Sequence, residues 1–136
     1  MFFKKKQDQN KNMDLTKVAA LLIHAAKIDE CYTLEEEKII KETILKMGTK
    51  EEDVLKIITE AKIIEENTNQ ILEFTKEVKN MDHNNKIKII ETLWRIIYSN
   101  KDADMYETSL MRRLAGLLYI DNKTMGDIKE RVKKTL

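Results

Sequence analysis

The amino-acid sequence predicts an all-α protein, a compact bundle of about seven helices with an internal pseudo-two-fold repeat. The chain of 136 residues contains no Pro and only three Gly, so few positions would interrupt a helix. Aromatic residues make up only 6% of the chain, whereas strands are usually rich in aromatic and β-branched residues. Apolar residues instead recur at a spacing that places them on one face of a helix.

A faint repeat relates segments 25–36 and 96–107, which lie 71 residues apart. Each segment runs from an apolar helix through a short acidic loop into a second helix. An Asx residue opens each loop, and a Glu follows seven positions later. Because repeats mark duplicated supersecondary units, we expect two related halves, 14–65 and 84–134, joined by a connector helix over 69–80.

The first half predicts three helices, over residues 15–28, 34–47 and 50–65. Their ends carry local signals, which are an Asp14 cap, a capping box at 33–36, a left-handed end at Gly48 and a second capping box at 49–52. The residues expected to face the core are Val18, Leu21, Leu22, Ala25, Ile40, Ile44, Met47, Val54, Ile57, Ile58 and Ala61.

The second half follows a break at 67–69 and a turn at 82–85, and it predicts helices over 84–99 and 105–118 and a last helix opened by Thr124. Asp104 is the expected cap of the helix over 105–118. The core residues expected here and in the connector are Ile71, Leu72, Thr75, Val78, Ile87, Ile90, Leu93, Trp94, Ile97, Leu110, Leu114, Leu117, Leu118, Met125, Ile128 and Val132.

Charge and cysteine usage narrow the function classes. The net charge is +1, but residues 14–111 carry −6 while the two ends are basic. An acidic body does not fit a nucleic-acid-binding domain, which needs a clustered basic face. The single Cys forms no internal disulfide, which fits a reducing compartment and a cytoplasmic location. No apolar run reaches the ~18 residues of a membrane span.

Residues 1–13 are expected to form a basic flexible tail before one helical domain over 14–136. The tail has no apolar stretch of the length found in signal peptides. One interpretation is a solvated terminus. The other is a weak contact with the inner face of the membrane, in which aromatic rings enter the lipid interface and ammonium groups meet anionic head groups. The contact residues would be Phe2, Phe3, Lys4, Lys5 and Lys6.

The two acidic corners of the repeat are the candidate metal site, because hard cations such as Ca²⁺ need clustered oxygen ligands. The alternative is helix capping, since carboxylates in a first helical turn stabilise the helix without a metal. An EF-hand is excluded because Met105 and Met111 stand where that loop needs Gly and Glu. The candidate ligands are Asp29, Glu36, Asn100, Asp102, Asp104 and Glu107.

No catalytic constellation is found in the sequence, and neither a phosphate-binding glycine loop nor a nucleophile motif occurs. We expect His24 to be half-buried and hydrogen-bonded, and His83 to be solvated in a polar turn. Cys31 lies among carboxylates that disfavour its thiolate. Trp94 is expected in the core, and Tyr98 is expected to pack against apolar residues. The chain is therefore predicted to be non-enzymatic.

The corners resemble those of the TerB family, the tellurite-resistance-associated helical domain related to the N-terminal domain of a membrane-linked DnaJ-type co-chaperone. The family hallmark A-x-A-D-G-x-[ILV]-x-x-x-E corresponds to 26–36 and to a second copy within 93–107, and the run 111–118 is also similar. The resemblance covers about residues 14–130. It implies an all-helical fold with two-fold similarity and a cytoplasmic, membrane-proximal role in stress-response assemblies.

The resemblance also implies a divalent-cation site at Asp29, Glu36, Asn100 and Glu107. Both family glycines are replaced, by Glu30 and Lys101, and Asn100 replaces an Asp. We therefore expect weaker cation binding than in a family member with both Asp residues. Asp102 and Asp104 are the residues expected to compensate for the loss. The expected function is a binding or scaffold module with protein partners, and the alternative is a metal-free docking or co-chaperone-like domain at the inner membrane face.

Overall fold

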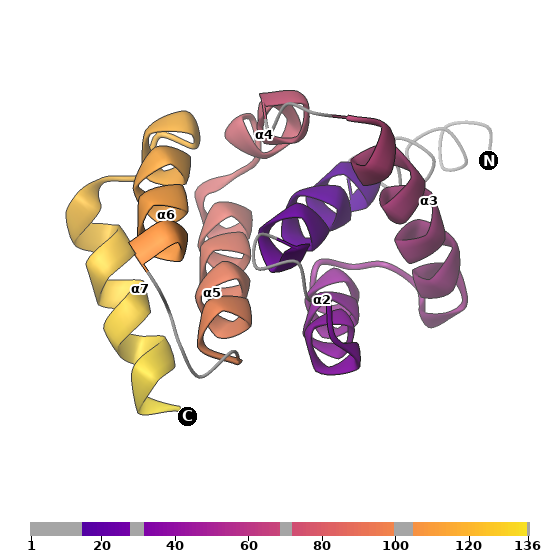
Figure 1. Cartoon of the computed structure of the whole chain (residues 1–136), viewed down its shortest axis with the longest axis horizontal. Helices are drawn as coiled ribbons and strands as arrows, with labels where there is room; N and C mark the ends of the chain where they lie inside the picture. The colour runs from indigo at the N-terminus through magenta and orange to yellow at the C-terminus, as the bar shows by residue number, and fades with distance from the viewer. Residues whose placement is uncertain (1–14, 28–31, 69–71, 100–104, 136) are drawn as a thin grey trace.

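The computed structural model describes residues 15–27, 32–68, 72–99 and 105–135 (Figure 1). Within these ranges it contains seven α-helices, the short 3-10 helix η2 and no strand, so the predicted all-α bundle is confirmed. The elements are a first helix over 15–26, α2 (Leu34–Lys46), η2 (Glu51–Asp53), α3 (Val54–Asn67), α4 (Leu72–Lys79), α5 (His83–Ser99), α6 (Met105–Leu117) and α7 (Asn122–Lys134).

The first helix runs through the middle of the bundle (indigo in Figure 1). The sequence predicted one apolar stripe, and its members Val18, Leu21 and Leu22 are fully buried. Ala19 and Ala20, which the stripe did not include, are equally buried, and so is Ile23. A helix that is apolar all round is a core helix rather than a surface helix, so the other elements assemble around this one.

The predicted ends of α2 are confirmed. The Thr33 hydroxyl accepts from the Glu36 N–H at 3.1 Å, and a Glu36 carboxylate oxygen accepts from the Thr33 N–H at 3.0 Å, which completes the capping box. Gly48 has φ of 107°, a value that L-residues rarely adopt. The N–H groups of Gly48 and Thr49 donate to the carbonyls of Leu45 and Ile44, and this pair of bonds is a Schellman motif.

The second predicted capping box, at 49–52, is wrong. Thr49 is buried, and its N–H closes the end of α2, so this residue belongs to the preceding helix end. The following turn is η2, and its N-cap is Lys50, which has no side chain able to accept a hydrogen bond. The last helix also begins earlier than predicted, at Asn122. Its N-cap is Asp121, and Thr124 donates to the Asp121 carboxylate.

Two helices of equal length stand 71 residues apart, because α2 spans Leu34–Lys46 and α6 spans Met105–Leu117. Both end in a residue with positive φ, which is Gly48 after α2 and Tyr119 (φ 57°) after α6. The Ile120 N–H donates to the Ala115 carbonyl at 2.9 Å, as the Thr49 N–H does to Ile44. The duplication of the two halves stays a prediction.

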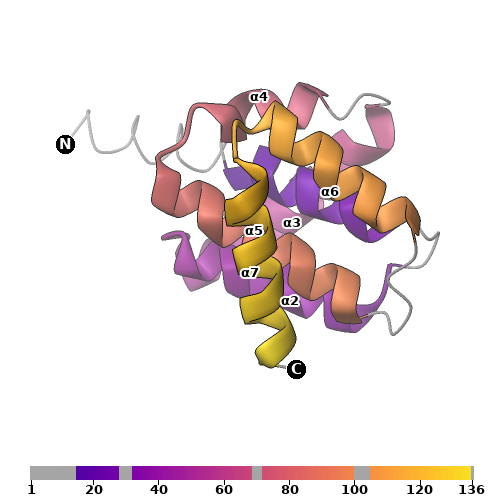
Figure 2. The same cartoon turned by 90° about the vertical axis from the view of Figure 1, so that its left-hand side faces the viewer.

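The helix α5 lies between α2 and α7 and packs against both (Figure 1). A buried hydrogen bond of 2.6 Å between the hydroxyls of Thr43 and Thr92 joins α2 to α5. On the other side α7 crosses α5, and α6 contacts both α4 and α7 (Figure 2). Among the residues that the structure describes, no helix is both long and apolar enough to cross a membrane.

Candidate functional site

The predicted cation ligands are only partly visible in the structure. Glu36 is the one whose side chain is described, while Glu107 belongs to α6 without a described side chain. Four candidates lie outside the described residues, namely Asp29, Asn100, Asp102 and Asp104. The predicted membrane contacts also lie outside them, namely Phe2, Phe3, Lys4, Lys5 and Lys6.

Glu36 is fully buried at the start of α2. One carboxylate oxygen accepts from the Thr33 N–H at 3.0 Å and from the Thr33 hydroxyl at 2.9 Å. The predicted capping role of this residue is therefore confirmed. In the part of the chain that the structure describes, no three His, Cys, Asp or Glu side chains gather in a way that would hold a metal ion.

A charged cluster follows the first corner. The Lys62 ammonium lies 2.6 Å from the Glu37 carboxylate, and Lys41 lies 3.8 Å from it. The hydrogen bond from Lys62 holds the pKa of Glu37 below its ordinary value. Burial and the adjacent Glu37 carboxylate raise the pKa of Tyr32, so its phenol stays protonated and donates to Glu37. These contacts hold the first turn of α2, and Tyr32 just before it, against α3.

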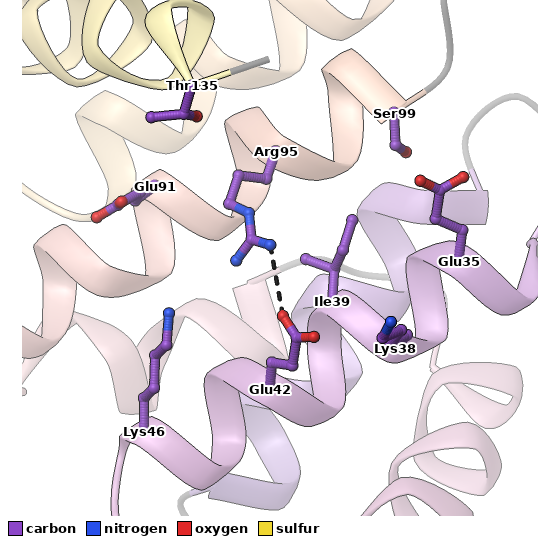
Figure 3. A pocket seen from close by; sticks show the side chains of 9 residues that line it. All are labelled: Glu35, Lys38, Ile39, Glu42, Lys46, Glu91, Arg95, Ser99 and Thr135. Atoms are coloured by element: carbon purple, nitrogen blue, oxygen red, sulfur yellow. Dashed lines mark hydrogen bonds and ion pairs between the residues drawn. The ribbon is translucent and has the colours of Figure 1, made fainter.

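A charged hollow lies between α2 and α5, with a volume of about 500 Å³ (Figure 3). Its charged walls alternate in sign. Arg95 reaches across from α5 and lies 3.4 Å from Glu42 on α2. The charged lining residues are Glu35, Lys38, Glu42, Lys46, Glu91 and Arg95, and the others are Ile39, Ser99 and Thr135.

This hollow is suited to contacts with charged groups. Arg95 and Glu42 are 32% and 42% exposed, so the pair is screened by solvent and adds little to stability. Both side chains therefore remain available to exchange partners. Sequence reasoning missed the hollow, although it placed Glu35 in the first acidic corner. Its residues come from helices far apart in the sequence, and no motif connects them.

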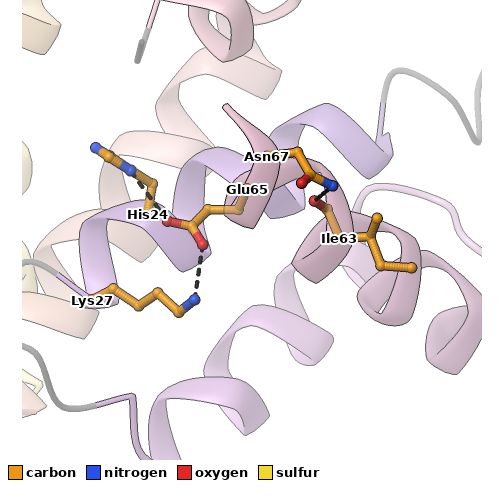
Figure 4. Close-up of polar contacts among 5 residues, drawn as sticks. All are labelled: His24, Lys27, Ile63, Glu65 and Asn67. Atoms are coloured by element: carbon orange, nitrogen blue, oxygen red, sulfur yellow. Dashed lines mark hydrogen bonds and ion pairs between the residues drawn. The ribbon is translucent and has the colours of Figure 1, made fainter. Parts of the chain in front are cut away.

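The expectations for the histidines had different outcomes. His24 is half-buried, and its Nδ1 lies 3.4 Å from the Glu65 carboxylate, which also binds Lys27 at 2.8 Å (Figure 4). The same view shows the Asn67 amide donating to the Ile63 carbonyl near the end of α3. The hydrogen-bonded His24 is thus confirmed. His83 is exposed, as expected of a solvated residue, but its turn placement is wrong, because His83 is the first residue of α5.

The aromatic residues of α5 lie where the sequence placed them. Trp94 is 5% exposed, and Tyr98 packs partly buried against the core. Their rings are stacked with centroids 6.1 Å apart. Cys31 lies outside the described residues.

Comparison with known proteins places the chain in a family. The search of curated proteins returned no match, and neither did the search of solved structures. The family model described as tellurite resistance protein TerB matches residues 15–130, which include all of the described helices except the end of α7. The match includes both acidic corners, the hollow's α2 and α5 walls and the capping box of α2, and the chain therefore belongs to the TerB family.

Proposed function

We propose that this chain is a non-enzymatic binding or scaffold module that acts in a tellurite-resistance-type stress response by docking another protein. TerB family domains are generally non-catalytic, and the family match suggests the stress role. The observation that carries the docking role is the hollow of alternating charge between α2 and α5. A partner surface of complementary charge pattern would fit there.

The chemistry of the hollow favours a protein partner over a small apolar ligand. Ile39 is the single apolar residue among the described lining residues, and most of the others carry a carboxylate, an ammonium group or a guanidinium. Charged groups arranged in this way give specificity and rate of association more than affinity. The docking is therefore expected to be salt-sensitive, because the Debye length falls from about 10 Å at 0.1 M salt to about 3 Å at 1 M.

Site-specific photo-crosslinking tests the docking role. A photoreactive amino acid replaces Lys38 at the hollow or, as the control, exposed Lys56 on α3. After tellurite challenge and irradiation of living cells, position 38 should yield discrete adducts. In lysates irradiated after the addition of high salt, these adducts should not form. Position 56 should yield none of these adducts. Equal adducts from both positions, or adducts from neither, would contradict docking at the hollow.

A genetic measurement tests the stress role separately. Deletion of the gene should raise tellurite sensitivity, and the wild-type chain should restore growth. The charge-reversed pair Glu42→Arg with Arg95→Glu retains opposite charges across the hollow but inverts their order. This variant should fold and fail to restore growth. If this variant fully restored growth, the stress role would not depend on the hollow.

We also propose that the first acidic corner takes part in binding a divalent cation. The observation in favour is Glu36, whose carboxylate is fully buried and oriented by Thr33. The candidate set of carboxylates and one amide carbonyl matches the oxygen donors that Ca²⁺ prefers. Glu36 would bind the cation. The second corner, which includes Glu107, would supply further oxygen ligands.

Thermal unfolding of chelator-treated protein tests cation binding. An ion at 100 times its Kd should stabilise the fold by roughly 2.7 kcal/mol, which raises Tm by several degrees. The comparison is the ion-induced shift within each variant, because Glu36→Gln also weakens the cap. Loss of the shift in both Glu36→Gln and Glu107→Gln supports the site. No shift with millimolar Ca²⁺, Mg²⁺, Mn²⁺ or Zn²⁺ leaves Glu36 as a helix cap.

We further propose a weak contact of the basic tail with anionic membranes, on the basis of its aromatic and lysine residues alone. Each basic residue near an anionic surface contributes about 1 kcal/mol. Co-sedimentation with anionic liposomes compares the full chain with one lacking residues 1–13. Equal binding by both would exclude the tail as the contact.

A further inference from the structure

A second groove lies between α5, α6 and α7 and has a volume of about 660 Å³. Its apolar walls are Trp94 from α5, Met111 and Ala115 from α6, and Met125 from α7. Methionine side chains are flexible and polarisable, so such walls adapt to the shape of an inserted side chain. The groove therefore has an apolar floor formed by these four buried residues, and polar side chains complete its lining.

The remaining lining residues are Arg112, Asn122 and Lys129, and none of the lining residues that the structure describes is acidic. Arg112 is exposed and forms no ion pair with a residue that the structure describes. The Lys129 ammonium lies 5.3 Å from the centre of the Trp94 ring, so it rests on an aromatic face instead of a carboxylate. Both cations are thus placed to meet negative charge from outside.

A buried donor adds an independent observation. The indole Nε1 of Trp94 is buried and has no hydrogen-bond acceptor among the described atoms. Burying a donor without an acceptor is unfavourable. Lys129 is only partly buried above this ring, so its side chain can move aside. A backbone carbonyl that entered the groove would then supply the missing acceptor.

We propose that this groove binds an acidic peptide segment that carries an apolar side chain. The apolar side chain occupies the slot between Met111 and Met125, and flanking carboxylates meet Arg112 and Lys129. The Asn122 amide has both a donor and an acceptor, which matches a peptide backbone. This site extends the binding role beyond the hollow between α2 and α5, and it stands or falls independently of that hollow.

Other occupants fit the groove less well. A free inorganic anion would contact the cations but leave the methionine walls uncovered. A nucleic acid would need an aromatic face on which bases can stack, whereas Trp94 is only 5% exposed and is covered by Lys129. A second copy of this chain offers acidic residues of its own, and the experiment below distinguishes that occupant.

Trp94 is the single tryptophan of the chain, so its fluorescence reports on this groove directly. The probe is a blocked eight-residue peptide made of Asp and Glu with one central Leu. Two matched peptides replace the Leu by Ser or every acid by Lys. The acidic Leu peptide should change the emission saturably. Each matched peptide should bind at least about tenfold more weakly, since one buried Leu side chain or the charge pairing is lost.

The matched variants carry equal charge changes. The groove variant, Arg112→Glu with Lys129→Glu, reverses both positive charges of the groove. The control variant, Lys56→Glu with Lys76→Glu, reverses the charges of two exposed lysines on α3 and α4. The groove variant should lose at least about tenfold in affinity, and the control should stay within about twofold. Arg112→Gln, a single change at an exposed position, serves as the readout if circular dichroism shows the groove variant unfolded.

Several results would overturn the proposal. They are an emission unchanged by the acidic Leu peptide, equal affinity in the groove variant, and equal affinity for the Ser peptide, which would indicate simple anion binding. Tighter binding of a single-stranded RNA oligomer would assign the groove to nucleic acid. An emission that changes with protein concentration alone, together with dimers in sedimentation, would assign it to a second copy.

Discussion

The buried hydroxyl pair of Thr43 and Thr92 is a sensitive test of how α2 packs against α5. Each side chain is 3% exposed, and their oxygens lie 2.6 Å apart. Each hydroxyl also lies near a carbonyl of its own helix, since Thr43 reaches Ile39 at 3.0 Å and Thr92 reaches Lys88 at 2.8 Å. Replacement of either threonine by valine keeps the shape and removes the hydroxyl.

The expected magnitude follows from counting protons. Two hydroxyl protons serve three contacts, so one of the three contacts always lacks a proton. After Thr43→Val, the Thr92 hydroxyl still donates to Lys88, so no buried donor is orphaned. Each single change should therefore cost about 1 kcal/mol, the net value of one hydrogen bond. The double change replaces both partners by apolar groups and should also cost about 1 kcal/mol or less.

A double-mutant cycle by urea denaturation measures this coupling. The four proteins should give a double-variant effect about 1 kcal/mol smaller than the sum of the single effects. Thr59→Val is the control, because Thr59 is exposed and bonds only to the Leu55 carbonyl of its own helix. It should change stability by at most about 0.5 kcal/mol. Additivity of Thr43→Val and Thr92→Val within about 0.4 kcal/mol would refute the reasoning.

Three further predictions concern local features. Thr33→Ala removes the N-cap of α2 and should lower the free energy of unfolding by about 1 kcal/mol at an unchanged urea m-value; an unchanged urea midpoint would contradict it. Gly48→Ala should destabilise the protein by about 1 kcal/mol, because the φ of Gly48 is 107°. Gly126→Ala should stabilise α7 by about 0.5–1 kcal/mol, because no atom lies within 4 Å of the added methyl group. Thermal unfolding of both variants checks that the two effects have opposite signs. The Lys62 ammonium keeps the pKa of Glu37 below its ordinary 4.5, so the Glu37 carboxylate binds a proton less readily in the folded state than in the unfolded state. The resulting stabilisation is fully present above pH 4.5 and is lost as the pH falls through the lower pKa of the folded state. Urea midpoints between about pH 3 and pH 6 should therefore fall less steeply for Glu37→Gln, and equal slopes would be inconsistent with the Lys62 contact.

The sequence by itself determined the helices and several of their ends. The absence of Pro and the helical spacing of apolar residues predicted the bundle, and α2, α5 and α6 begin and end within one residue of the expected positions. The Thr33 capping box and the Gly48 end were predicted because each depends on residues within one or two turns. Signals of this range form from local contacts alone, unless a second local signal competes for the same residue.

A local signal fails where two helix ends compete for the same residue. The segment from Thr49 has the sequence of a capping box, yet the end of α2 uses the Thr49 N–H and buries its side chain. The exposed turn then begins at Lys50. The sequence contains both signals, and only the packing of the helix end decides between them.

The tertiary structure alone decided which side chains meet. Phe74 is 1% exposed, although it was not among the residues expected to face the core. Arg95 meets Glu42 across the hollow, and Arg112 joins Trp94 at the second groove. These residues are brought together by the angles at which α5 packs against its neighbours. Such angles arise from the fit of whole helix surfaces, so no short segment of the sequence encodes them.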